Sequence, residues 1–156
     1  MNKPEFTASH QKESVVELVV TQGDITPYGS ASFINYVRWY GIARDALLQW
    51  KNLGFDESLK GLVEIEASYC NIQYKRQAML QDEIIIKTNA ANIKGSGFSL
   101  LFTLLKKDDA SLISLGKQDI SFRHSKTGEL LKVSDILVKG LLAPIEVDEK
   151  SMLFKF

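Results

Sequence analysis

The chain has 156 residues with 19 basic and 19 acidic side chains, so its formal net charge is zero. This balance argues against nucleic-acid binding, because proteins that bind a duplex normally carry a cationic excess. No apolar run is long enough to span a membrane, and the polar start lacks the apolar core of a signal peptide, so we expect a cytoplasmic protein. With Cys70 as the only cysteine and His10 and His124 as the only histidines, the sequence predicts no disulfide, no metal site and no cofactor.

At this length we expect one domain over residues 1–156, with 1–13 as a flexible lead-in. Residues 14–22 are rich in β-branched side chains and predict the first strand. After a Pro-Tyr-Gly turn, residues 33–50 predict a long helix, because apolar side chains recur at intervals of three and four. This helix is apolar around most of its circumference, so we expect other elements to cover it on several sides.

Four further strands are predicted at residues 62–74, 83–93, 97–106 and 111–123, followed by a short helix at 132–142. Short polar turns separate the strands and suit antiparallel hairpins. The predicted fold class is therefore α+β, with an antiparallel five-stranded sheet wrapped around one long central helix.

A motif of glycines, polar residues and aromatic residues surrounds the start of the predicted helix. It reads Gly23-Asp24-Ile25-Thr26-Pro27-Tyr28-Gly29, then Asn35-Tyr36, Arg38-Trp39 and Arg44. This motif resembles the signature of hotdog-fold thioesterases of the hydroxybenzoyl-CoA thioesterase type, and the order of elements extends the resemblance to about residue 123. The resemblance implies the hotdog fold and hydrolysis of acyl thioesters.

The chain departs from that signature at Thr26, where the family carries an Asp that acts as nucleophile or general base. A neutral residue at this place is similar to the enediyne-like branch, whose thioesterases accompany polyketide and polyunsaturated fatty acid synthases. The implied substrate is an acyl-carrier-protein or acyl-CoA thioester, with release of a fatty acyl or polyketide chain. Thr26 could hold a water molecule, but an unactivated hydroxyl is a poor base, and an equal alternative is a turn residue that bonds its own backbone.

Hydrolysis of a thioester needs a donor that stabilises the negative charge developing on the carbonyl oxygen. The first amides of a helix have no partners within the helix, and by the family match we expect the amide of Phe33 to be this donor. The alternative is an ordinary helix start satisfied by Ser30 or by water.

Other residues of the motif have weaker assignments. Asp24 is a second candidate for the base, and Tyr28, Gly29, Asn35 and Tyr36 are candidates for binding the substrate. Arg44 lies about 16 Å along the helix from Phe33 at the usual rise per residue. It could therefore pair with Asp24 or Asp45, hold a substrate carboxylate, or reach the site of a partner subunit. Lys75 and Arg76 could meet CoA phosphates or an acidic carrier protein, or could simply form a soluble rim.

The sequence thus favours an acyl thioesterase over a weakly active or non-catalytic protein that binds acyl thioesters. A hotdog dehydratase or hydratase is disfavoured, because neither histidine lies near the helix start in the sequence. Residues 86–95 carry little that would block strand pairing, so we expect a homodimer. The resemblance implies that the subunits share active sites and that dimers can pair into a homotetramer.

Overall fold

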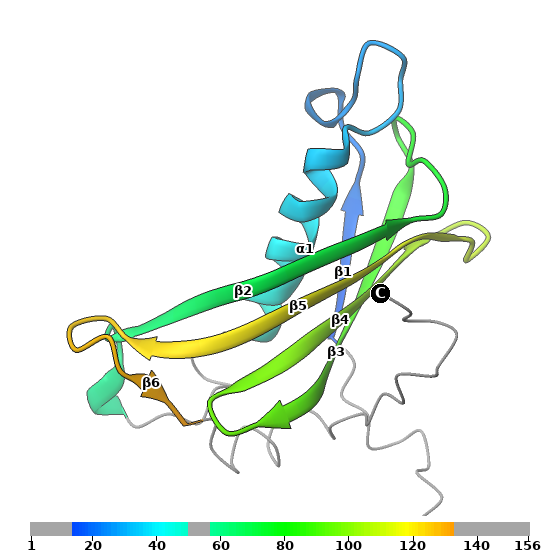
Figure 1. Ribbon diagram of the computed structural model, residues 1–156. Coiled ribbons are helices and arrows are strands. Elements are labelled where there is room, and N and C mark those ends of the chain that lie inside the picture. Colours follow the sequence, from blue (N-terminus) through cyan, green and yellow to red (C-terminus); the bar gives the residue numbers. More distant parts are fainter. Residues whose placement is uncertain (1–13, 50–56, 133–156) are drawn as a thin grey trace, which may run out of the picture.

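The computed structural model describes residues 14–49 and 57–132, which form one curled antiparallel sheet and one long helix (Figure 1). The strands are β1 (Ser14–Val19), β2 (Val63–Tyr74), β3 (Glu83–Lys94), β4 (Gly97–Lys106), β5 (Leu112–His124) and β6 (Leu130–Leu131). The helix α1 spans Phe33–Leu47, and short 3₁₀ turns occur at Gln22–Asp24 (η2) and Glu57–Leu59 (η3). The strand order is β1-β3-β4-β5-β2, with β6 paired to β5.

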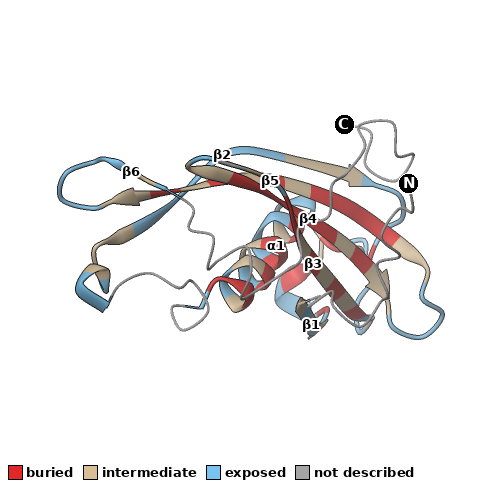
Figure 2. Ribbon diagram, turned by 90° about the horizontal axis from the view of Figure 1, so that it is seen from below, coloured by how far each residue is buried: buried red, intermediate tan, exposed pale blue. Residues whose placement is uncertain are grey.

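Helix α1 lies on the concave face of the sheet and packs against β1 and β3 (Figure 2). Trp39 and Tyr40 are almost fully buried, and the Tyr40 ring lies 4.7 Å from that of Phe102 on β4. The Tyr40 hydroxyl forms a hydrogen bond with Ser114 on β5, while its ring covers Gly116. Burial of these rings and satisfaction of the buried hydroxyl together fix the helix on the sheet.

One side of α1 and the last strand of the sheet are left uncovered within the described chain. Phe33 is 71% exposed and Ile34 is 63% exposed, and most of β2 is exposed along its length. We expected the helix to be covered on several sides. The face that carries Trp39 and Tyr40 is covered, but the first turn of the helix is not covered by the described residues of this chain.

The predicted elements agree closely with the observed ones, with two differences. The helix ends at Leu47, where the amide of Leu48 bonds the Arg44 carbonyl oxygen at 2.8 Å, so it stops before the predicted end at residue 50. The sheet gains the two-residue strand β6, which the sequence did not predict. Residues 86–95 were expected to form an open edge, and this holds for most of them: β1 pairs with β3 only from Glu83 to Thr88, so within the described residues the later part of β3 has no strand partner on that side.

Within the described residues, β1 and β2 end the sheet, so the outer sides of these two strands are also unpaired. Of the predicted C-terminal helix, only Lys132 falls within the described residues, and it is not helical; the predicted lead-in 1–13 also lies outside them. In the described ranges, no helix has both the length and the apolar character that a membrane span requires.

Candidate active site at the start of the helix

A tight turn delivers the chain to the start of α1. The amide of Gly29 donates to the Thr26 carbonyl oxygen at 3.0 Å, and the amide of Thr26 donates to the Ser30 carbonyl oxygen at 2.8 Å. Gly29 has a φ of 84°, a left-handed conformation that glycine adopts without steric cost. The Pro-Tyr-Gly turn predicted from the sequence is therefore confirmed, and it ends at Ser32, the extended residue that precedes the helix.

Asp24 anchors this turn to the helix and is only 4% exposed. Its carboxylate accepts hydrogen bonds from the amide and the hydroxyl of Thr21, at 2.8 and 2.9 Å, and forms an ion pair with Arg38. Its backbone carbonyl accepts from the Ser32 amide at 2.9 Å and from the Asn35 side-chain amide at 2.7 Å. The carboxylate and the backbone carbonyl of Asp24 therefore both connect the loop to the first turns of α1.

The carboxyl group of Asp24 is held in its ionised form. Burial alone disfavours the charge, but the hydrogen bonds from Thr21 and the nearby Arg38 guanidinium outweigh it and hold the pKa of Asp24 below its ordinary value. Both carboxylate oxygens are already bonded, which leaves Asp24 poorly placed to take a proton from water.

A hollow with a cavity volume of about 330 Å³ opens between the start of α1 and the end of β2. Its walls are aromatic and apolar at the helix and polar or cationic along the chain that follows β2. The lining residues are Ala31, Phe33, Tyr36, Tyr74, Lys75, Arg76 and Gln77.

The first amides of α1 differ in whether they have acceptors. The Ser32 amide bonds Asp24 and the Asn35 amide bonds the Ser32 carbonyl oxygen at 3.0 Å, but the Ser32 side chain caps nothing. Within the described ranges, the amide of Phe33 has no acceptor. The hydroxyl of Ser30 lies 3.3 Å from that of Thr26, and no bond from it to the helix occurs among these residues. A free, oriented donor at the positive end of a helix suits an oxygen that gains negative charge.

Two tyrosines form one wall of the hollow. Tyr36 is 3% exposed, and its hydroxyl accepts a hydrogen bond from the Ala78 amide at 3.0 Å. The Tyr74 ring meets the Tyr36 ring edge-on at 4.9 Å, and the Tyr74 hydroxyl donates to the Phe33 carbonyl oxygen at 3.3 Å. Burial is the main cause that raises the pKa of each hydroxyl above its ordinary value, so both tyrosines are neutral at physiological pH.

The structure brings together only part of the predicted site. Phe33 and Tyr36 line the hollow, while Asp24 and Asn35 lie behind it as supports of the turn. The hydroxyl of Thr26 lies 3.3 Å from the Tyr28 amide, which donates to it, so Thr26 bonds its own turn.

Three further predicted residues also lie outside this lining. Tyr28 is 91% exposed next to Gly29 on the turn, and Arg44 pairs with Asp45 at 2.9 Å near the other end of the helix. Sequence reasoning missed Tyr74 and Gln77. Their only signal was their position at and after the end of a predicted strand, because pairing between β2 and the helix start depends on tertiary contacts.

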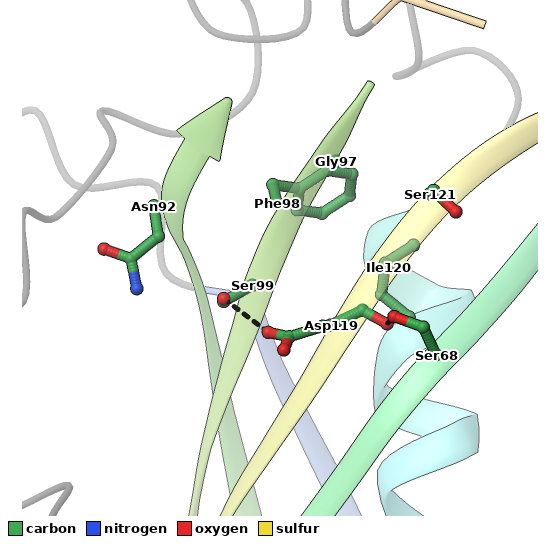
Figure 3. Close-up of a pocket in the computed structure, with 8 residues that line it drawn as sticks. All are labelled: Ser68, Asn92, Gly97, Phe98, Ser99, Asp119, Ile120 and Ser121. Carbon is green, nitrogen blue, oxygen red and sulfur yellow. Dashed lines mark hydrogen bonds between the residues drawn. The ribbon is translucent and has the colours of Figure 1, made fainter. Parts of the chain in front are cut away.

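A second hollow of about 240 Å³ lies over β2, β4 and β5 (Figure 3). Its polar side chains, which include Ser99 and Asp119, alternate along their strands with the core residues Phe98 and Ile120, so they face away from the core. The Ser99 hydroxyl donates to the Asp119 carboxylate at 2.7 Å, and the Ser68 hydroxyl donates to the Asp119 carbonyl oxygen at 3.4 Å. No group of metal-binding side chains occurs in the described part of the chain, and no histidine lines this hollow.

A curled antiparallel sheet that holds one long helix on its concave face defines the hotdog class of α+β domain. A profile of the thioesterase-like superfamily matches residues 20–150, so the chain belongs to this superfamily. The fold and superfamily expected from the sequence are thereby confirmed. A comparison with curated protein sequences gave no match.

Solved structures of thioesterases share the fold at low sequence identity. The dynemicin thioesterase is 20% identical, with a TM-score of 0.73 over 83% of this chain and 94% of its own. A variant of 4-hydroxybenzoyl CoA thioesterase, in complex with 4-hydroxybenzoyl CoA, is 17% identical, with a TM-score of 0.72 over 83% and 99%. A 1,4-dihydroxy-2-naphthoyl-CoA thioesterase from Synechocystis is 11% identical, with a TM-score of 0.71 over 83% and 95%.

Proposed function

We propose that this chain hydrolyses acyl thioesters of CoA or of an acyl carrier protein and releases a fatty acyl or polyketide chain. The observation that carries the proposal is the free amide of Phe33 beside a hollow lined by aromatic rings and cations, in a member of the thioesterase-like superfamily. The dynemicin thioesterase binds a polyene, which supports an extended acyl chain, and the 4-hydroxybenzoyl CoA thioesterase binds a CoA ester, which supports a CoA thioester.

In this proposal the thioester carbonyl oxygen accepts a hydrogen bond from the Phe33 amide. Water adds to the carbonyl carbon, negative charge develops on that oxygen, and the amide stabilises it without needing to reorganise. The carbon–sulfur bond then breaks, and the products are a carboxylic acid and a thiol. The thiolate that leaves takes up the proton lost by the attacking water.

The lining also suits the two parts of such a substrate. Phe33, Tyr36 and Tyr74 offer apolar surface to the acyl group. Lys75 and Arg76 offer positive charge to a phosphate, which CoA and the phosphopantetheine arm of a carrier protein both carry. Arg76 is steadied for this by a hydrogen bond to the Ser111 hydroxyl at 2.8 Å.

No carboxylate of the described residues lines the hollow, so none of the described Asp or Glu side chains is the proposed base. Thr26 can direct water only through its hydroxyl, and Arg44 could act only at the site of a partner subunit. We therefore expect modest turnover, because a water molecule without a general base loses a contribution of about a hundredfold or more.

We also propose that the chain forms a homodimer, which can pair again into a tetramer. The exposed apolar start of α1 and the open edge of β2 support this, because apolar surface is stabilised by burial and an open strand edge offers backbone groups for pairing with another chain. A partner subunit in this position would border the hollow.

A protein that binds acyl thioesters without hydrolysing them is the second candidate, and the lack of a carboxylate in the lining favours it. The test measures thiol release from a panel of acyl-CoAs and from an acyl carrier protein. Release above the uncatalysed rate supports the enzyme. Protection of the fold by an acyl-CoA, without thiol release from any substrate, supports the binding protein and contradicts the hydrolase.

A further inference from the structure

We propose that Tyr74 is a catalytic residue, whose hydroxyl donates a second hydrogen bond to the thioester carbonyl oxygen beside the Phe33 amide. This inference rests on the proposed function and names a further group of the same site. The end of β2 meets the start of α1 at the hydroxyl of Tyr74, which donates to the Phe33 carbonyl oxygen.

This hydroxyl is bonded to the residue that carries the free amide. It lies 3.3 Å from the Phe33 carbonyl oxygen, and that oxygen is three covalent bonds from the Phe33 amide nitrogen. Both Tyr74 and Phe33 line the same hollow. The amide and the carbonyl of a helical residue point in opposite directions along the axis, so the tyrosine side chain has to swing across the hollow to reach a substrate oxygen that accepts from the amide.

The hydroxyl is weakly held in its present bond. Hydrogen bonds between a hydroxyl and an oxygen are usually about 2.7–2.8 Å long, so a 3.3 Å contact contributes little. Its acceptor, the Phe33 carbonyl, belongs to the first residue of α1, and a carbonyl at that position also accepts from the amide four residues on in a regular α-helix. Transfer of the tyrosine donor to a substrate oxygen would leave this carbonyl satisfied.

Tyr74 and Tyr36 lie side by side, and their contacts give them different tasks. The Tyr36 hydroxyl is committed to the Ala78 amide inside the core, whereas Tyr74 is 49% exposed and faces the hollow. The raised pKa of Tyr74 keeps its proton in place at physiological pH, as a donor requires. A neutral donor at this point stabilises the oxyanion and cannot serve as the base.

The test compares Tyr74→Phe with Tyr69→Phe in the full-length protein. Phenylalanine keeps the edge-on contact with Tyr36 and removes only the hydroxyl, so the variant should fold. Tyr69 is on the same strand, but it lies outside the hollow and its ring faces Lys117. We expect Tyr74→Phe to lower kcat by about a hundredfold with little change in KM, as when one donor to an oxyanion is removed, while Tyr69→Phe stays at the wild-type rate.

A second readout separates a direct contact from a structural role. The probe is a non-hydrolysable methyl-ketone analogue of hexanoyl-CoA with a ¹³C-labelled carbonyl, observed by infrared spectroscopy. We expect the bound carbonyl to absorb at lower frequency in the wild type and in Tyr69→Phe than in Tyr74→Phe. A kcat loss without this frequency difference would mean that Tyr74 only positions the helix start, which overturns the proposal.

The proposed function and this inference fail in different ways. If the wild type hydrolyses acyl thioesters and Tyr74→Phe matches it in kcat and carbonyl frequency, the inference alone is wrong. If the wild type neither releases thiol nor binds the ketone analogue, the proposed function is wrong, and the role of Tyr74 is wrong with it.

Discussion

At the scale of single residues, Thr26 and Asp24 share one loop but differ in how firmly the fold holds them. Asp24 is buried and fully bonded, whereas Thr26 is half-buried and its hydroxyl meets only the Ser30 hydroxyl and the Tyr28 amide, each at 3.3 Å. These long contacts leave the Thr26 hydroxyl able to hold water. The same contacts also suit a residue that merely shapes the turn.

Replacing Thr26 by alanine distinguishes these two roles. If the hydroxyl positions the attacking water, Thr26→Ala should lower kcat by roughly tenfold, which corresponds to losing about 1.4 kcal/mol of transition-state stabilisation. Ser30→Ala is the matched control, because it removes the other hydroxyl of the pair. Equal losses of activity in the two variants would assign the effect to the turn and contradict a role for Thr26 in catalysis.

Asp24 should make the stability of the protein depend on acid pH. Because its folded pKa is lowered, its contribution is present above the unfolded value of about 3.9 and is lost as the pH falls through the lower folded value. At pH 7 we expect Asp24→Asn to cost about 1–3 kcal/mol, the usual cost of disrupting buried hydrogen bonds to a charged group. Urea unfolding at pH 7 and at acid pH checks this, and a difference between wild type and variant that stayed constant down to pH 2 would contradict it.

At the scale of elements, the packing of α1 on β5 depends on one glycine. A Cβ atom added at Gly116 would lie 2.8 Å from Cε2 of the buried Tyr40 ring, closer than such atoms approach. The ring cannot move away easily, because its hydroxyl is bonded to Ser114 and its face meets Phe102. The helix and the sheet therefore approach closely only where this strand lacks a side chain.

We expect Gly116→Ala to destabilise the fold by about 1–3 kcal/mol, the typical cost of overpacking a core. Gly41→Ala is the matched control, because Gly41 lies within α1 and has nothing within 4 Å of an added Cβ. That variant should gain about 0.5–1 kcal/mol, because alanine favours a helix more than glycine does. Urea unfolding of both proteins measures the difference, and a neutral Gly116→Ala would show that Tyr40 is not confined.

The strands and the helix were predictable because their signals are local. The spacing of apolar residues in 33–47 and the polar turns between strands identify elements without any tertiary information. The two-residue strand β6 carries no comparable pattern, since it forms only by pairing with Phe122 and Arg123. The free amide of Phe33 could be predicted in the same way, because the sequence indicates where the helix begins. Tyr74 could not be predicted, because it joins the site only through its contact with Phe33, 41 residues away in the sequence.

At the scale of the whole molecule, the uncovered surfaces gather at the helix start and along β2. Ile34 is 63% exposed on the first turn, and among the described strands β2 has no partner on its outer side. β1, which ends the sheet on the other side, also exposes an apolar residue, Val15, at 50%. The two surfaces differ in what surrounds them, because only the first borders the hollow.

We expect light scattering to show a dimer or a tetramer at micromolar concentration. Ile34→Glu should shift the protein towards the monomer, because an interface would bury the new charge without a partner. Val15→Glu, which places the same charge at the other edge, should leave the dimer intact. A wild-type monomer, or dissociation by Val15→Glu alone, would contradict an interface at the helix start.

The hydrogen bond from Tyr74 to Phe33 joins the last residue of β2 to the first residue of α1. The chain that connects these two elements leaves from their other ends, after Leu47 and before Val63. A change in the length of that connection would therefore act on the ends of α1 and β2 that lie away from the hollow. We expect this connection to tolerate inserted residues, and it offers an engineer a place to insert a reporter or to relocate the termini.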